Sequence, residues 1–192
     1  MQSPIDIFGE IWREARRTGS LEHRNAVCLS TIDADGYPDS RFVDLKDAGE
    51  DGFAFCTHLD SVKALDIERN QKAGMTMWWE HVATQIRIKG QCERLSAQEA
   101  DRHWEDRSRD AQVVTTTFEQ SRPLAEPGLL GETYARAVAA HDGQTIARPG
   151  NWGGFRLRPD YVEFLEFKKS RLHVRTAYTL IGGTWRKDFL QP

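Results

Sequence analysis

Alternating apolar and polar residues mark most of this chain as short β-strands. A side-chain period of two is typical of a strand that buries one face, and Val, Ile, Phe and Thr favour that conformation. The runs that fit are "NAVCLSTI", "SRFVDLK", "DGFAFCTH", "AGMTMWWE", "TQIRIKGQCERL", "GFRLRPDYVEFLEF", "SRLHVRTAYTL" and "TWRKDFL". Asp35 and Gly36 lie between the first two runs and predict a tight hairpin turn there.

Residues 3–20 carry apolar residues at helical spacing instead. Ser3 is the expected cap of this helix, and Pro4 suits its first turn. Gly19 is the expected end, because glycine commonly follows the last helical residue. The chain is therefore predicted to begin with an amphipathic helix.

Three further helices are predicted. A short one covers "SVKALDIERN", and the run "LSAQEADRHWEDRSRD" is the clearest, because Ser96 and Glu99 fit a capping box. The last runs from about Glu132 to His141. A doubly wound sheet needs a helix between successive strands, and most strands here have none. The pattern favours an antiparallel α+β barrel or sandwich.

Size and charge limit the partners of this chain. Its 192 residues suffice for one domain, and 39% of them are hydrophobic. A net charge of −3 gives nucleic acid and membrane surfaces no general attraction, so we expect neither as a partner. No apolar run approaches the roughly 20 residues of a bilayer span. The first residues lack a secretory signal pattern, so we expect a cytoplasmic protein.

The three cysteines, Cys28, Cys56 and Cys92, lie far apart in strand-like runs. Their spacing fits neither a disulfide framework nor a zinc site, so we expect free thiols and no metal. The motifs GxGxxG, GxxxxGK[ST], HExxH and GxSxG are missing from the sequence. A phosphate site in this chain would have to be built from side chains and from strand or loop amides.

The stretch "RLHVR" places Arg171, His173 and Arg175 at alternate positions. In an extended strand these three groups would share one face and repel one another. A bound anion would offset that repulsion, and phosphate suits the arginine fork. The alternative is a strand face in water, where charged residues are common.

Four other segments could contribute to an anion site. Each also has an ordinary structural explanation, either as a polar strand or helix face in water or as a helix cap. A helix N-terminus with nearby hydroxyls attracts phosphate, and a glutamine can hydrogen-bond a ring that presents donors and acceptors. The segments are "SRFVDLK" with Arg41 and Lys46, "CTHLDSVK" with Thr57, Ser61 and Lys63, "ATQIRIKG" with Gln85, and a helix face with His103 and Arg107.

Together and in this order, these segments resemble the pyridoxamine 5′-phosphate oxidase family, the FMN-binding split β-barrels. The pieces that carry the resemblance are "RFVDLK", "QIRIKGQCERLSAQEA", "SRDAQ", "NWGGFRL" followed by "VEF", and "RLHVR". The resemblance implies a split antiparallel β-barrel with flanking helices, as a single domain over residues 1–192. Residues 151–192 resemble the dimerisation segment of the family, so the implied unit is a homodimer with FMN at its interface.

The resemblance also implies the residues of the site. FMN would meet Arg41, Phe42, Val43, Lys46, Thr57, Lys63, Gln85, Gln120, Ser121 and Arg175. A phosphorylated pyridine substrate would meet Lys46, His103, Arg107, Arg171 and His173, of which Arg171 and His173 would be catalytic. The implied reaction moves a hydride from C4′ of pyridoxamine or pyridoxine 5′-phosphate to flavin N5. Molecular oxygen then accepts the electrons, and the products are pyridoxal 5′-phosphate and hydrogen peroxide.

Several positions depart from the family pattern. They are His103 and Ala111 where tyrosine and serine are usual, Val62 for arginine, Cys56 for tyrosine, Leu165 for tryptophan and Val174 for aspartate. A lost charge-assisted hydrogen bond costs about 1.5–3 kcal/mol. Two alternatives therefore stay open. One is an FMN oxidoreductase for another small aromatic substrate, as in the related phenazine-pathway enzymes, and the other is a flavin-binding protein without turnover.

Overall fold

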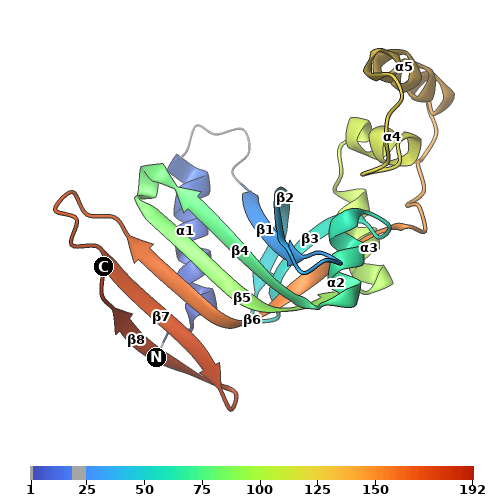
Figure 1. The fold of residues 1–192 in the computed structure, drawn as a ribbon. Helices are drawn as coiled ribbons and strands as arrows, with labels where there is room; N and C mark the ends of the chain where they lie inside the picture. The colour runs from blue at the N-terminus through green and yellow to red at the C-terminus, as the bar shows by residue number, and fades with distance from the viewer. Residues whose placement is uncertain (1, 19–24) are drawn as a thin grey trace.

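A computed structural model describes residues 2–18 and 25–192 of the chain. Its strands form one antiparallel sheet in the order β3-β2-β1-β4-β5-β6-β7-β8 (Figure 1). β3 also pairs with β6, which closes the first six of these strands into a barrel. The strands are β1 (Ala26–Ile32), β2 (Pro38–Gly49), β3 (Gly52–His58), β4 (Lys72–Trp79), β5 (Thr84–Arg94), β6 (Trp152–Glu166), β7 (Val174–Ile181) and β8 (Thr184–Leu190).

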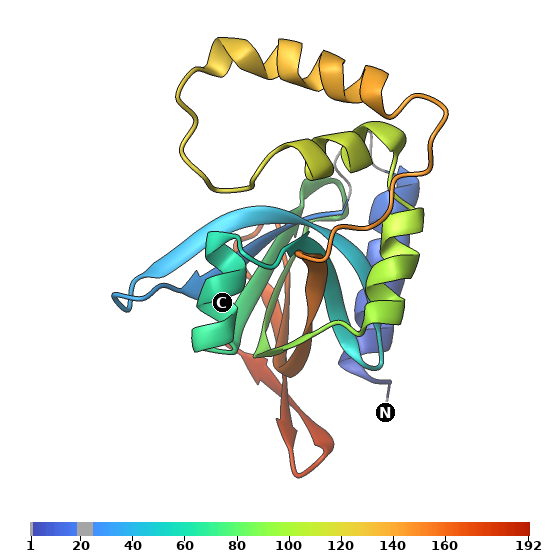
Figure 2. The same ribbon diagram turned by 90° about the vertical axis from the view of Figure 1, so that its right-hand side faces the viewer.

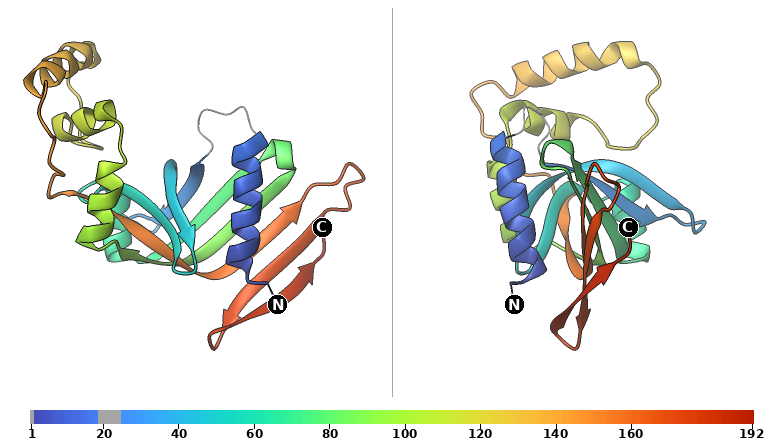
Figure 3. Two further views of the ribbon diagram at one scale, coloured as in Figure 1. Left: turned by 180° about the vertical axis from the view of Figure 1, so that it is seen from behind. Right: turned by 90° about the vertical axis from the view of Figure 1, so that its left-hand side faces the viewer.

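Helices flank this barrel, so the predicted split antiparallel barrel with flanking helices is confirmed. Figure 2 shows α5 lying apart from the strands, with α4 between, and Figure 3 shows α1 against the other end of the sheet. The β7–β8 hairpin extends away from the barrel in all views. The helices are α1 (Pro4–Thr18), α2 (Val62–Arg69), α3 (Ala97–Glu105), α4 (Arg109–Thr117) and α5 (Leu130–Ala140), with short 3-10 turns η1 (Glu80–Val82) and η2 (Pro127–Leu129).

The core fills the barrel and the space beneath α1. Phe8 of α1 is fully buried and meets Phe53 of β3 edge to face, with ring centroids 4.8 Å apart. Alternate residues of β4 and β5 point inward, which is the period of two that the sequence shows. A second small cluster of Trp104, Val113 and Trp152 packs α3 and α4 onto the start of β6.

Most predicted elements are confirmed. Asp35 and Gly36 lie in the β1–β2 turn, and Gly36 has φ 87°. The capping box of Ser96 and Glu99 is present at α3. Ser3 Oγ accepts a hydrogen bond from the Asp6 amide, as expected for the cap of α1. The predicted end of that helix, Gly19, lies outside the described residues.

Three predicted boundaries were wrong. The helix expected to run to Asp110 ends at Glu105, and a separate helix, α4, begins at Arg109 after a turn capped by Ser108. α5 begins at Leu130, two residues before the predicted start. The last correction affects the site, because the strand expected from residue 170 begins only at Val174.

Gly154 of the "NWGGFRL" stretch lets β6 approach its neighbours closely. A Cβ on Gly154 would lie 2.2 Å from the Phe55 carbonyl oxygen and 2.9 Å from Leu95 Cδ1. Gly153 pairs with Thr57 of β3, next to this contact. The motif therefore serves the closure of the barrel.

We predict that Gly154→Ala destabilises the protein by about 2–3 kcal/mol, because the new methyl group collides with backbone. Gly9→Ala is the matched control. It adds a methyl group inside α1, where nothing lies within 4 Å, and should stabilise the protein by about 0.5–1 kcal/mol. Urea unfolding measures both changes, and equal stability of the two variants would contradict the close approach.

Candidate anion-binding site

A buried ammonium lies where β3 ends and α2 begins. The Lys63 residue is only 8% exposed, and its Nζ donates to Thr57 Oγ1 at 3.3 Å and to Ser61 Oγ at 3.4 Å. Burial lowers the pKa of Lys63, and the nearby Arg41 lowers it further. The carboxylates of Asp39 and Asp66 act in the opposite direction and offset this in part. Two hydroxyls are weak partners for a buried cation, so this site favours an added anion.

The first turn of α2 also faces this site with free donors. Ser61 is the N-cap residue, yet its side chain accepts no capping hydrogen bond. Ser61 Oγ instead donates to the His58 carbonyl at 2.7 Å. The first amides of a helix lack intrahelical acceptors, and the helix dipole makes them a binding site for anions.

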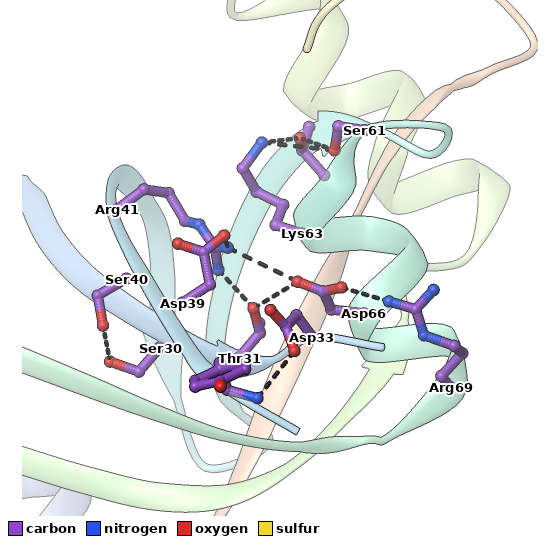
Figure 4. Close-up of polar contacts among 12 residues, drawn as sticks. Ser30, Thr31, Asp33, Asp39, Ser40, Arg41, Ser61, Lys63, Asp66 and Arg69 are labelled. Carbon is purple, nitrogen blue, oxygen red and sulfur yellow. Dashed lines mark hydrogen bonds and ion pairs between the residues drawn. The ribbon is translucent and has the colours of Figure 1, made fainter. Parts of the chain in front are cut away.

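Arg41 of β2 provides a second cation at the same place (Figure 4). Its Nη1 donates to Thr31 Oγ1 at 2.6 Å, and its Nη2 contacts Asp39 and lies 3.7 Å from Asp66 Oδ2. Asp66 is fully buried on α2 and accepts hydrogen bonds from Thr31 at 2.9 Å and Arg69 at 2.6 Å. Contacts with Thr31 and Asp66 therefore hold the Arg41 guanidinium in place.

Gln120 joins this cluster from the loop after α4. Its Oε1 accepts a hydrogen bond from Thr57 Oγ1 at 3.0 Å and lies 3.4 Å from the His58 amide. Ser121 follows it with φ 70°, a left-handed conformation that is uncommon for serine. The structure thus brings together four of the predicted cofactor residues, Arg41, Thr57, Lys63 and Gln120.

A second cationic group lies on the other side of β3. Arg107 Nη2 donates to the Ala111 carbonyl at 3.2 Å and to Thr115 Oγ1 at 2.9 Å. Its guanidinium lies 5.2 Å from the centre of the Trp152 ring. Its Nε is buried and has no hydrogen-bond partner among the described residues, which is unusual for a buried donor.

Lys46 and His103 are the neighbours of Arg107 in the predicted substrate site. Lys46 Nζ donates to Asp44 Oδ2 at 2.5 Å, so part of its charge is already compensated. Burial lowers the pKa of His103, which favours its neutral form near neutral pH. Burial also raises the pKa of Cys56 to about 11, against the influence of Lys46 and Arg107. The prediction that His103 and Arg107 share one helix face was wrong, because Arg107 lies beyond Glu105, the last residue of α3.

The remaining predicted residues lie elsewhere. Gln85 of β5 pairs with Leu165 of β6, and Leu165 pairs with Arg175 of β7. Arg175 makes an ion pair with Glu163 at 2.7 Å. Burial opposes ionisation of Glu163, but hydrogen bonds from Tyr161 and Arg175 outweigh it and lower its pKa.

The predicted common strand face of Arg171, His173 and Arg175 was wrong, because Arg171 and His173 precede β7. Arg171 has φ 67°, and its carbonyl accepts a hydrogen bond from the His173 amide at 2.9 Å. His173 Nδ1 accepts from the Lys168 amide at 3.1 Å. A neutral His173 ring therefore carries its proton on Nε2. The ring also lies 4.8 Å from that of Phe167.

The two predicted neighbours of Arg41 differ in their surroundings. Val43 is partly buried against the core, whereas Phe42 is 74% exposed on the outer face of β2. Trp78, Leu172 and Phe189 are other large apolar side chains that remain exposed. Such exposed apolar groups are typical of a surface that contacts a partner.

The predicted site residues therefore lie at two separate places within one chain. One place is the end of β3, with Lys63 and Arg107 nearby, and the other is the end of β6 near Arg175. Thr57 pairs with Gly153 near the start of β6, whereas Arg175 pairs with Leu165, twelve positions later. At about 3.3 Å per residue this is roughly 40 Å of strand. Figure 1 shows the two ends of β6 at opposite ends of the sheet. One small ligand cannot contact both groups of the same chain.

Two other classes of site receive no support from the described residues. Within residues 2–18 and 25–192, no cluster of His, Cys, Asp and Glu side chains is suited to holding a metal ion. Over the same ranges, every helix is too short or too polar to cross a bilayer.

The topology and the flanking helices define the chain as a split antiparallel β-barrel, and comparisons with known proteins show its family. Residues 13–137 match the family model described as pyridoxamine 5′-phosphate oxidase. Residues 152–192 match the pyridoxine 5′-phosphate oxidase C-terminal dimerisation region. The chain therefore belongs to the pyridoxamine 5′-phosphate oxidase family, which consists of FMN-dependent oxidoreductases.

Individual relatives agree with this family. A pyridoxine/pyridoxamine 5′-phosphate oxidase from Herminiimonas arsenicoxydans is 36% identical over 98% of this chain and 89% of its own length. A pyridoxine/pyridoxamine 5′-phosphate oxidase from a Synechocystis species is 35% identical over 95% of this chain and 85% of its own length. PhzG from Burkholderia lata 383, solved with tetrahydrophenazine-1-carboxylic acid, has a TM-score of 0.92 and 29% identity over 100% of this chain and 94% of its own. An FMN-binding relative from Nostoc punctiforme shares the fold, with a TM-score of 0.81 and 20% identity.

The residues at the barrel end fit an FMN phosphate. Lys63 and Arg41 supply two buried or largely buried cations, and Thr57 and the first turn of α2 supply neutral donors. This donor set is suited to a phosphate, which accepts several hydrogen bonds at once. The partnerless Nε of Arg107 similarly fits an anionic group of a second ligand.

Sequence reasoning missed several residues of this site. Thr31 and Asp66 hold Arg41 in place but are far apart in the chain, so no local pattern links them. His58 lies between the two cationic groups, and burial lowers its pKa. Its buried Nδ1 has no hydrogen-bond partner among the described residues. Asp39 had a readable signal, because it stands two positions before Arg41 and directly precedes the predicted strand.

We predict that Lys63→Met stabilises the flavin-free protein by about 1 kcal/mol and weakens FMN binding at least tenfold. The variant removes a buried cation whose burial is costly in the absence of an anion, and with it a phosphate partner. Lys72→Met is the control, since Lys72 is exposed and follows the C-terminal end of α2, whereas Lys63 lies in its first turn. Thermal unfolding and FMN titration measure the two effects, and a lower melting temperature for Lys63→Met would contradict the argument.

Proposed function

We propose that this protein oxidises pyridoxamine or pyridoxine 5′-phosphate with FMN as cofactor. Oxygen would be the electron acceptor, and pyridoxal 5′-phosphate and hydrogen peroxide would be the products. The observation that carries the proposal is the pair of cationic groups on the two sides of β3. A flavin nucleotide and a phosphorylated substrate bring two anions, one for each group.

The two groups are separated by the alternation of β3. Thr57 contacts Lys63, whereas the preceding Cys56 lies near Lys46 and Arg107. Successive side chains of a strand point to opposite faces, so one strand end divides the two anion sites. The Lys63 side would hold the FMN phosphate, and the Arg107 side would hold the substrate phosphate.

Bound FMN would supply the acceptor for the hydride that leaves the substrate. The protein's own groups would bind, orient and protonate the substrate. Anchoring an anion at Arg107, away from the reacting carbon, converts binding energy into alignment. His173 Nε2 would donate a hydrogen bond to the substrate, because its Nδ1 accepts one from the Lys168 amide.

Two copies of the chain would complete each site. The Lys63 group and the Arg175 group lie at opposite ends of β6, so a site that uses both must take one group from each copy. Exposed apolar side chains such as Phe42 and Phe189 supply a surface for such a contact. Residues 152–192 match a dimerisation region, which supports a homodimer.

A second candidate substrate is a small aromatic carboxylate. Asp44 compensates part of the charge of Lys46, and Ala111 offers Arg107 only its backbone carbonyl. The substrate site therefore presents less positive charge than a phosphate dianion favours. The similarity to PhzG, whose structure contains a ring system with one carboxylate, agrees with this alternative.

We predict that pyridoxamine 5′-phosphate bleaches the yellow FMN absorbance of the purified protein under anaerobic conditions. Arg107→Ala should raise KM for this substrate at least tenfold and leave FMN affinity unchanged, because it removes one charge-assisted contact. Arg102→Ala, which removes an exposed cation from α3, is the control. Bleaching by an aromatic carboxylate alone would favour the second candidate, and no bleaching by either would favour a binding protein without turnover.

The shared site predicts a complementation result. Arg41→Ala and Arg175→Ala should each lose FMN binding when assembled alone. In a mixed dimer one of the two sites keeps both arginines, so an equal, randomly exchanged mixture should regain about a quarter of the wild-type FMN sites. FMN stoichiometry after exchange measures this. Failure of the mixture to regain any binding would show that the two arginines do not act across copies.

A further inference from the structure

Each cation that β2 contributes to the predicted sites has an aspartate two positions before it. Asp39 contacts Arg41, and Asp44 accepts a hydrogen bond from Lys46 at 2.5 Å. Residues two apart on a strand share a face, so the stretch "DSRFVDLK" builds both contacts into one strand. A carboxylate next to an anion-binding cation is unfavourable for the anion, because like charges repel.

The surroundings of Arg41 show which of its two neighbouring carboxylates can move away from the guanidinium. Arg41 and Lys63 are balanced by Asp39 and Asp66, and the half-exposed Arg69 adds one more positive charge. Asp66 is a fixed part of the site, because its side chain is 1% exposed. The Asp39 side chain is 47% exposed and can turn toward water.

We infer that Asp39 is a built-in competitor for the phosphate of FMN. This inference rests on the proposed function and extends it. The Asp39 carboxylate occupies Nη2 of Arg41, the same planar group that would bind a phosphate oxygen. FMN binding then requires Asp39 to leave this contact, so the aspartate weakens the affinity for the nucleotide.

The rival interpretation is that Asp39 positions Arg41 for the phosphate. Other contacts already perform that task. Thr31 accepts from Nη1 at 2.6 Å, and the buried Asp66 lies 3.7 Å from Nη2 (Figure 4). Both remain when Asp39 is replaced, so Arg41 keeps its orientation and gains a free donor.

The test is titration of the flavin-free protein with FMN and with riboflavin, which lacks the phosphate. Asp39→Asn should lower the Kd for FMN about five- to tenfold and leave the Kd for riboflavin unchanged. Asp35→Asn removes the same charge from the turn of the same hairpin and should change neither.

The outcomes separate this inference from the proposed function. If wild-type protein binds FMN and Asp39→Asn binds it equally or more weakly, the competitor role is wrong and the proposed function stands. An equal gain for riboflavin would also overturn the inference, since the effect would not involve the phosphate. If neither protein binds FMN, both are wrong. Asp39→Ser is a second variant for the case that Asp39→Asn fails to fold, which thermal unfolding detects.

Discussion

The pairing of β3 with β6 is the constraint on which the rest of this structure depends. It closes the barrel, and it fixes the end of β3 beside the start of α2. Gly154 permits the approach, because any side chain there would meet the backbone of β3. Closure also buries Lys63 away from water, where Coulomb interactions are strong. A packing requirement of the sheet thus produces an environment in which an anion is strongly favoured.

The same strand end separates the two cationic groups to which the proposal assigns cofactor and substrate. Cys56 and Thr57 point to opposite sides of β3, one toward Arg107 and the other toward Lys63. A rigid strand holds the two anion sites at a fixed separation, which would set the distance between cofactor and substrate phosphates. The proposed cofactor side is built on β2, β3 and α2, whereas His173 lies in the loop before β7.

Local patterns predicted the fold well and the site in part. The period of two in β4 and β5 and the capping box at Ser96 depend on neighbours in sequence, so they were readable. The late start of β7 was not, because "SRLHV" alternates like a strand although Arg171 adopts a left-handed conformation. Thr31 and Asp66 meet only after the barrel closes, and no sequence spacing reveals such a contact. The separation of Thr57 and Arg175 toward opposite ends of β6 likewise follows from topology.

The length of β6 has a consequence for populations that contain damaged chains. In the proposed homodimer each chain would carry one half of two different sites, because the two halves lie too far apart to meet within one chain. A chain that has lost both halves would leave its dimer with no working site, even when its companion is intact. Defective chains would thus inactivate sites in dimers with intact chains, in proportion to how often the two assemble together. A minority of defective chains would reduce the total activity by more than their fraction of the population.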